Sequence, residues 1–356
     1  MGGQAPSSGV AIATEFVTLR KRRATCQAHW LMSRPRLPLA IAAAAIIIAG
    51  IGLGAVISGS HAGPQPSGTS PTEATGPSDP TAKQNLTDPL TGGTVSDHPV
   101  VAAKVENIAA ARPQVGLSQA DITFIQEVEG AQTRLLVVYH SRFPKRVGPI
   151  RSARSTDAQL LPLFGKPGLV YSGANSSVQR ELDNASIVSI QRSTRDSRRV
   201  APHNVFVNLD KIAKSKRLAE AKSIGWTFND AAPQGATAES VKVRVGRDTF
   251  DFRYSSGRYT VRWNGSRYAD SGTITKADNV VIMNVRNHPD GNRDVQGARS
   301  VQSDTVGTGA VMIYRDGRKI EGRWERTKAS APLEFIDQSG TAIALKPGQT
   351  WVALAG

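Results

Sequence analysis

Cysteine is nearly absent from this 356-residue chain, in which Cys26 is the single example. One cysteine excludes an internal disulfide framework and a cysteine-based metal site. Histidines are also few, and His98, His140, His203 and His288 show none of the spacings typical of metal ligands. The sequence therefore predicts neither a metal centre nor a bound cofactor.

Acidic residues are in deficit, with 29 Asp and Glu against 44 Lys and Arg and a formal net charge of +15. Such an excess indicates an anionic partner, for example nucleic acid, anionic lipid or an acidic envelope polymer. The excess is concentrated between residues 134 and 199, where twelve basic residues face four acidic ones. This segment is where we expect a binding site for an anion.

One long apolar segment, Leu37–Ile57, is uncharged and long enough to span a bilayer. Residues 1–36 before it are strongly basic, and basic flanks stay in the cytoplasm. We therefore expect a single-pass transmembrane helix, a signal anchor over residues 37–58, with all later domains outside the cytoplasm.

Two features of this region leave alternatives open. The tripeptide SHA at residues 60–62 is an acceptable cleavage site, and cleavage there would release the rest of the chain. Met32 begins a second basic stretch, so residues 1–31 are a candidate for a mis-assigned start. No cysteine follows the apolar segment, which excludes lipid attachment through cysteine.

The rest of the chain divides by composition. Residues 59–85 are rich in Pro, Ser, Thr and Gly and lack large apolar side chains, which predicts a disordered linker. Residues 86–230 alternate strand-like and helix-like runs and predict a mixed α/β (α+β) N-terminal domain. After a second linker at 231–240, residues 241–356 contain short strands separated by turns, which predicts a small all-β C-terminal domain.

Several elements of the N-terminal domain can be placed. Runs at 121–129 and 134–140 predict a hairpin, and HNVFVN at 203–208 predicts another strand. Helices are predicted over 155–164, 176–184 and 209–222. Their predicted N-caps are Ser155, then Ser176 or Ser177, and Asn208.

A basic loop precedes the first of these helices. It carries Arg146, Arg151 and Arg154, and the next acid is Asp157. A helix N-terminus with guanidinium groups beside it suits phosphate or carboxylate. Asp157 argues against a site at the helix itself, because an acid in the first turn already satisfies the helix dipole. Ordinary solvated surface charge is the competing interpretation.

Two further loops contribute candidates. The second strand-to-helix junction would place Ser176 at the same sheet edge. It lacks the G-x-S-x-G pattern of serine hydrolases, so a helix cap is the better interpretation. The stretch RRVAPHN brings together Arg198, His203 and Asn204. His203 is either a general acid or base, a phosphate donor, or a histidine that only supports the loop.

Carboxylates supply the remaining candidates. Glu127 and Glu129 lie two apart on one predicted strand and hence on one face. Such a pair suits acid–base chemistry, or else it compensates nearby arginines on an exposed face. The weak catalytic candidates are His203, Glu127 and Asp121. The ligand-binding candidates are Arg146, Arg151, Arg154, Ser155, Ser176, Arg198, His203 and Asn204.

Several motifs follow one another across residues 86–356, namely DPLTG (88–92), KVEN (104–107), ARPQVGLSQADI (111–122), VEGAQTRLLVVY (128–139), RVGPIRSAR (146–154), YSGA (171–174), APHNVFVN (201–208), GTGAVMIYRDGRKIEGRW (307–324) and LKPGQTWVALAG (345–356). Together they resemble the YerB-like lipoproteins, a bacterial envelope family of unknown function. The resemblance implies a two-domain envelope protein and assigns no catalytic residue. Family members often carry a lipid-attached cysteine, whereas this chain has an apolar segment, and either would tether the domains to the outer leaflet.

Three functions remain. The preferred one is a non-enzymatic envelope protein, tethered to the cytoplasmic membrane through Leu37–Ile57, that binds an anionic wall polymer or lipid head group. The second is an envelope enzyme acting on a phosphorylated or glycan substrate. The third is a scaffold that docks a protein partner through Trp263, Trp324 and Trp351, although these more simply form the core. A nucleic-acid partner is disfavoured by the expected external location.

Overall fold

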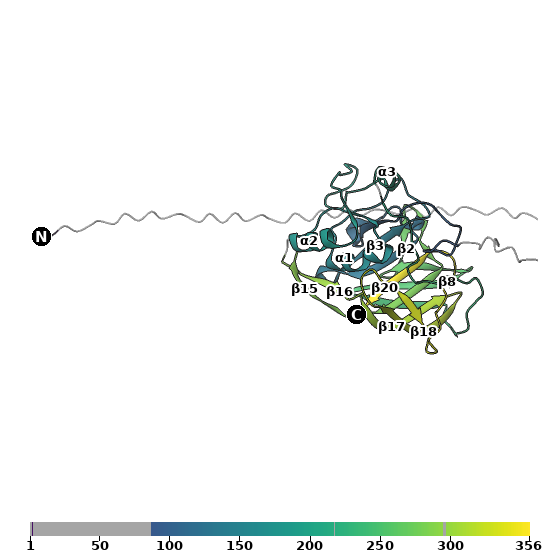
Figure 1. Cartoon of the computed structure of the whole chain (residues 1–356). Coiled ribbons are helices and arrows are strands. Elements are labelled where there is room, and N and C mark those ends of the chain that lie inside the picture. The colour runs from purple at the N-terminus through teal and green to yellow at the C-terminus, as the bar shows by residue number, and fades with distance from the viewer. Residues whose placement is uncertain (1, 3–86, 217, 295–296) are drawn as a thin grey trace, which may run out of the picture. The chain divides into compact units, whose positions relative to one another are not determined.

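The computed structural model describes residue 2 and residues 87–216, 218–294 and 297–356 (Figure 1). The expected cytoplasmic segment 1–36, the apolar segment 37–58 and the linker 59–85 lie outside the fold described here. Within the described ranges, no helix has the length and apolar character needed to cross a membrane. The described residues from Thr87 to Gly356 belong to one compact unit.

A mixed sheet of eleven strands organises this unit. The hairpin expected between 121–129 and 134–140 is confirmed, because β2 (Ile122–Glu127) pairs antiparallel with β3 (Thr133–Tyr139). The C-terminal strand β20 (Thr350–Ala355) lies between β2 and β14 (Asn279–Asn284) and runs parallel to both. The full order is β19 (Glu334–Ile336), β18 (Arg318–Arg326), β17 (Gly307–Arg315), β14, β20, β2, β3, β1 (Val101–Glu106), β4 (Gly168–Tyr171) and β5 (Val188–Gln191), with β6 (Ala236–Thr237) on β18.

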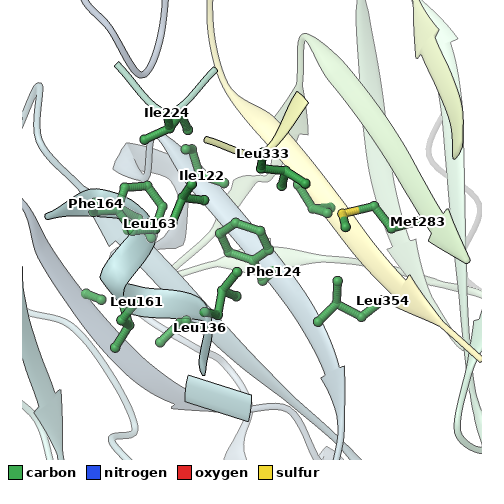
Figure 2. Packing of buried hydrophobic residues seen from close by; sticks show 14 of the residues in the cluster. Ile122, Phe124, Leu136, Leu161, Leu163, Phe164, Ile224, Met283, Leu333 and Leu354 are labelled. Atoms are coloured by element: carbon green, nitrogen blue, oxygen red, sulfur yellow. The ribbon is translucent and has the colours of Figure 1, made fainter. Parts of the chain in front are cut away.

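Both faces of this sheet are covered by apolar residues. Phe124 and Leu136 point to one face, where Phe164 meets Phe124 edge to face with ring centres 6.4 Å apart (Figure 2). Ile125 and Leu135, one residue along each strand, point to the other face. Because the central strands are buried on both sides, they consist of apolar runs and do not alternate with polar residues.

Two helices cover the first face, and a third packs against the second. α1 (Ser155–Leu160) continues as a 3-10 turn, Leu161–Phe164, and α2 (Ser176–Asn184) has its predicted bounds. α3 (Leu209–Ser215) contributes Leu209 and Ile212 to the second face and ends seven residues earlier than predicted. It ends early because the chain beyond it is extended and Glu220 forms a β-bridge with Pro99.

The strand predicted at 203–208 is wrong in its extent. Val205 and Val207 form only isolated bridges, with Arg195 and Val147 respectively. The chain there crosses two separate loops and does not follow one neighbouring strand, so a continuous ladder cannot form.

The C-terminal region is mostly β, as predicted. One part packs on the second face of the large sheet as a separate antiparallel sheet. Its main strands are β7 (Ser240–Val245), β8 (Asp248–Ser255) and β9 (Arg258–Trp263), with β10 (Ser266–Arg267) and β13 (Lys276–Ala277) paired to β9. Two two-stranded ribbons are β11 (Ala269–Asp270) with β12 (Thr273–Ile274), and β15 (Asn287–Arg293) with β16 (Arg299–Ser303).

The two sequence regions share the eleven-stranded sheet. Apart from the polar residues at their ends, the runs that form β14 and β20 are apolar, so each needs covered faces and neighbours on both edges. Trp324 and Trp351 are each 2% exposed and belong to the two cores, so they do not form the exposed aromatic surface considered for a scaffold. Trp263 is half-buried under the guanidinium of Arg112, 3.9 Å from its ring centre.

Candidate functional site

A cavity of about 680 Å³ opens beside the carboxyl end of β1 and the start of β3. Its wall carries an unusual density of charge, with four guanidinium groups against three carboxylates. We call it the arginine cavity. The charged residues on its wall are Arg134, Arg151, Arg154, Arg293, Glu106, Glu129 and Asp294, and His203 lies among them.

Arg151 is fixed by the backbone on each side of it. Its N–H donates to the Lys104 carbonyl on β1 at 2.8 Å, and its own carbonyl accepts from the Ser172 N–H after β4 at 3.0 Å. Its Nε lies 2.9 Å from Glu106 Oε1 as an ion pair without the angle of a hydrogen bond. The side chain is 25% exposed, so the rest of its guanidinium is accessible from the cavity.

Glu106 also holds His203. Its second oxygen, Oε2, lies 2.7 Å from His203 Nδ1, so one buried carboxylate joins an arginine and a histidine from distant parts of the chain. The structure therefore brings Arg151 and His203 together, with Glu106 between them.

Arg154 forms a closed pair with Glu129. Its Nε lies 2.5 Å from Glu129 Oε1, and its Nη2 donates to Oε2 at 2.7 Å. Burial raises the pKa of the Glu129 carboxyl, but Arg154 and Arg134 outweigh burial and lower the pKa overall. Because its third nitrogen donates to the Ala153 carbonyl at 2.7 Å, Arg154 shapes the wall and contributes charge, with few donors left for a ligand.

Arg134 lies on β3 directly across from Glu106 and Gln126 on the two neighbouring strands. Its Nη1 donates to the Ser152 carbonyl at 3.0 Å. Burial, with Arg154 and Arg151 nearby, lowers the pKa of Arg134 to about 9. Crowding of like charges is unfavourable, so a bound anion would stabilise this cluster.

The start of α1 differs from the prediction. The N-cap position is Arg154, and Ser155 is the first helical residue. Asp157 accepts from the Arg154 N–H at 2.8 Å and from buried Lys104 Nζ at 2.7 Å. The helix has six residues, and the carboxylate of Asp157 already offsets the partial positive charge of its first turn. The positive charge available to a ligand here therefore comes from arginine side chains.

The cap predicted at Ser176 is also wrong, because Asn175 takes that role and accepts from the Val178 N–H at 2.8 Å. Asparagine offers the same acceptor one residue earlier, and it lies on the cavity wall while Ser176 does not. Ser155 faces a different hollow, with its hydroxyl 3.1 Å from Asp290 Oδ2.

The other basic candidates lie outside the wall. Arg146 and Arg198 both bind Asp196, and Arg146 stacks on Phe206 with its guanidinium carbon 4.0 Å from the ring centre. These contacts, above all the hydrogen bond from Arg198, hold the pKa of the Asp196 carboxyl well below its usual range. Asn204 accepts from Arg195 Nη1 at 2.7 Å. Of the predicted ligand-binding set, the cavity brings together Arg151, Arg154 and His203.

The predicted carboxylate pair does not form. Glu127 ends β2, and Glu129 begins a 3-10 turn in which Gly130 has φ of 64°, so the two side chains do not share a strand face. Glu127 accepts from Asn287 at 3.1 Å. Asp121 accepts backbone N–H groups at His140 and Ser141, at 2.5 and 2.9 Å, and burial raises its pKa.

Sequence reasoning missed Glu106, Arg134 and Arg293 as site residues. Glu106 and Arg134 are charged positions inside apolar strands, and that contrast was the available signal. Arg293 comes from β15, more than 130 residues after Arg151 and Arg154, and no local pattern relates it to them.

Residues 86–223 match the N-terminal domain, and residues 240–352 the C-terminal domain, described as "Protein of unknown function (DUF3048)". The chain belongs to the DUF3048 family. A Bacillus subtilis (strain 168) protein named "Putative lipoprotein YerB" is 27% identical over 304 residues, covering 77% of this chain and 87% of that protein. The crystal structure of YerB from Bacillus subtilis has a TM-score of 0.64 at 25% identity and covers 76% of this chain and 96% of its own.

These matches confirm the resemblance to YerB-like proteins that the motifs indicated. Most of the arginine cavity is built by the DUF3048 N-terminal domain, and the DUF3048 C-terminal domain adds Arg293, Asp294 and Ala298 through the β15–β16 hairpin.

Proposed function

We propose that this protein binds an anionic, phosphate- or carboxylate-bearing envelope ligand in the arginine cavity. The observation that carries the proposal is convergence. Arg134 on β3 lines the same cavity as Arg151 and Arg154, which lie together in the loop that leads into α1. Arg293 joins them from the C-terminal region. Five motifs that carry the family resemblance meet there. They contribute Glu106, Glu129 to Arg134, Arg151 to Arg154, Gly173 and Ala174, and Pro202 and His203.

The cavity suits a small organic anion. Its volume falls within the range of about 300–1,000 Å³ that is usual for ligand pockets. Arg151 retains accessible donors, and guanidinium groups bind phosphate or carboxylate with two parallel hydrogen bonds. Glu106 and Glu129 are each already paired with an arginine, so they reduce the positive charge without abolishing it.

Two observations support an envelope location. A relative is named "Putative lipoprotein YerB", and the apolar segment Leu37–Ile57 of this chain offers a membrane tether of its own. A protein held outside the cytoplasmic membrane meets phosphate-bearing wall polymers and anionic lipid head groups, and these are the ligands we propose.

Calorimetric titration of the full chain in uncharged detergent tests this function, with inorganic pyrophosphate and citrate as probes. We expect at least one probe to bind, with affinity that falls as salt rises because the contact is ionic. Arg151→Ala should lower the affinity at least about tenfold, the loss of one charge-assisted bidentate contact.

Arg198→Ala is the matched control, because Arg198 is 76% exposed, lies outside the cavity and contacts Asp196. It should change the affinity by less than about twofold. Absence of binding by both probes, or equal effects of the two substitutions, would contradict the proposal. Thermal unfolding of each variant checks that the fold is retained.

A further inference from the structure

The contact between Glu106 and His203 has a geometry that anion binding does not require. Glu106 binds His203 through Nδ1, at 2.7 Å, which leaves Nε2 as the second ring nitrogen. Among the residues that the structure describes, none contacts Nε2 as a hydrogen-bond or ion-pair partner, and the His203 side chain is 16% exposed on the cavity wall. A carboxylate on one ring nitrogen fixes the tautomer and orients the other nitrogen.

Two other histidine–carboxylate pairs occur among the described residues, and they differ from the pair of His203 and Glu106 in their surroundings. His140 and Asp88 are both fully buried, with Nε2 and Oδ2 2.9 Å apart. His288 pairs with Asp304 on the surface, outside the cavity. Of the three pairs, that of His203 lies on the wall of the arginine cavity, beside accessible guanidinium donors.

We propose that the arginine cavity hydrolyses a phosphate ester, with His203 as the catalytic acid and base. The inference rests on the proposed function, because Arg151 and Arg134 must hold the phosphoryl group. His203 Nε2 would then face the reacting oxygens. Glu106 is a positioning residue, which orients the imidazole through Nδ1.

The reaction balances with water as the second reactant. The oxygen of water forms a bond to phosphorus while the bond from phosphorus to the ester oxygen breaks. His203 Nε2 accepts a proton from water and delivers one to the departing oxygen, so the products are an alcohol and a phosphate. Guanidinium groups stabilise charge on the phosphoryl oxygens during the transfer.

The apolar part of the cavity wall favours an organic phosphate ester over inorganic phosphate. Ile108, Ala174 and Pro202 give the cavity apolar surface beside its charges. Inorganic phosphate would leave that surface uncovered, whereas an ester places its organic group against it.

The test uses the full chain with phenyl phosphate and diphenyl phosphate, a monoester and a diester whose phenolate leaving group benefits from protonation. Released phenol is measured over a range of pH, and pyrophosphate binding is measured on the same samples. We expect wild-type protein to release phenol from at least one ester. His203→Asn should lower kcat about 100-fold or more, the usual contribution of acid–base catalysis, with pyrophosphate affinity within about threefold of wild type.

Glu106→Gln keeps a hydrogen-bond acceptor for the imidazole and removes the charge. It should lower kcat about tenfold and displace one limb of the pH–rate profile, which a purely structural role would not do. His288→Asn is the matched control, since it removes a paired histidine outside the cavity, and it should leave the rate unchanged.

The outcomes separate the two proposals. Wild-type protein that binds pyrophosphate but hydrolyses neither ester, or a His203→Asn variant that retains the rate, overturns the hydrolysis and leaves anion binding intact. Protein that binds no anionic probe overturns both.

Discussion

Arg326 shows how this protein uses arginine inside its core. It is 1% exposed, and its guanidinium donates to the carbonyls of Thr305, Gln159 and Leu160 at 3.3, 3.2 and 3.1 Å. Burial lowers the pKa of Arg326 to about 10, which lies well above neutral pH, so it stays charged. These hydrogen bonds join β18 to the end of α1.

Replacing Arg326 with Met should lower the free energy of unfolding by about 3 kcal/mol or more, because several buried carbonyls would lose their donor. Urea unfolding measures this change. Arg318→Met, on the exposed end of the same strand, is the control and should change stability by less than about 0.5 kcal/mol. A loss below about 1 kcal/mol for Arg326→Met would contradict this role.

The pair of His140 and Asp88 gives the protein a pH-dependent contact. Burial opposes both charges, but the ion pair outweighs it, so the pKa of His140 is raised above 6.5 and that of Asp88 is lowered below 3.8. The histidine contributes stability below pH 6.5, and this is lost as pH rises through its raised pKa. The aspartate contributes above pH 3.8, and this is lost as pH falls through its lowered pKa.

The pair should therefore stabilise most between about pH 4 and 6.5. We predict that His140→Gln lowers Tm by several degrees at pH 5.5 and by clearly less at pH 8.5. Differential scanning calorimetry at both pH values measures this, with His98→Gln as the exposed control. An equal loss at both pH values would show that the ion pair contributes nothing.

At the scale of elements, the junction between β1 and α1 positions the basic loop. Lys104 on β1 is fully buried and binds Asp157 on α1, and burial lowers the pKa of Lys104 to about 8. Asp157 in turn accepts the Arg154 N–H. The loop that carries Arg151 is thus held between a strand and a helix by one buried ion pair.

Breaking this ion pair from one side should cost about 3–5 kcal/mol, because it leaves an uncompensated buried charge. We predict such a loss for Lys104→Met and for Asp157→Asn in urea unfolding. The double variant removes both charges and keeps an acceptor for the Arg154 N–H, so it should recover part of the loss. Additive losses would contradict the coupling.

Most elements could be predicted from local pattern, and the errors have local causes. Apolar runs and turn residues indicated the hairpin of β2 and β3, and Asn208 capped α3 as expected, accepting from the Lys211 N–H at 3.0 Å. Ser155 and Ser176 were assigned as caps because serine favours that position, yet the neighbouring residue took it in each case. The early end of α3 depends on a bridge to a distant residue, which no local pattern contains.

At the scale of the whole molecule, β20 connects the two family domains through its parallel pairing with β2 and β14. Val352 lies at its centre and is fully buried. Val352→Asp should therefore reduce hydrogen-exchange protection in β2 and β14 together. Val200→Asp, at a position 81% exposed, should leave protection unchanged. Loss confined to β14 would show that the domains are stabilised independently.

The candidate site could be predicted only in part, because segments that are distant in the sequence build it together. Arg151, Arg154 and His203 stood out because basic loop residues are visible in sequence. Glu106 and Arg134 become neighbours through the pairing of β1 with β3. Arg293 reaches the cavity wall because the C-terminal region folds against the N-terminal one. Sheet order, and not local composition, decides which charges meet.

A crystal structure of the protein soaked with pyrophosphate tests anion binding in the arginine cavity most directly. We expect the probe inside this cavity, with its oxygens within hydrogen-bond distance of Arg151 and Arg134. Pyrophosphate bound only at exposed arginines such as Arg198, with the cavity unoccupied at saturating concentration, would contradict this expectation.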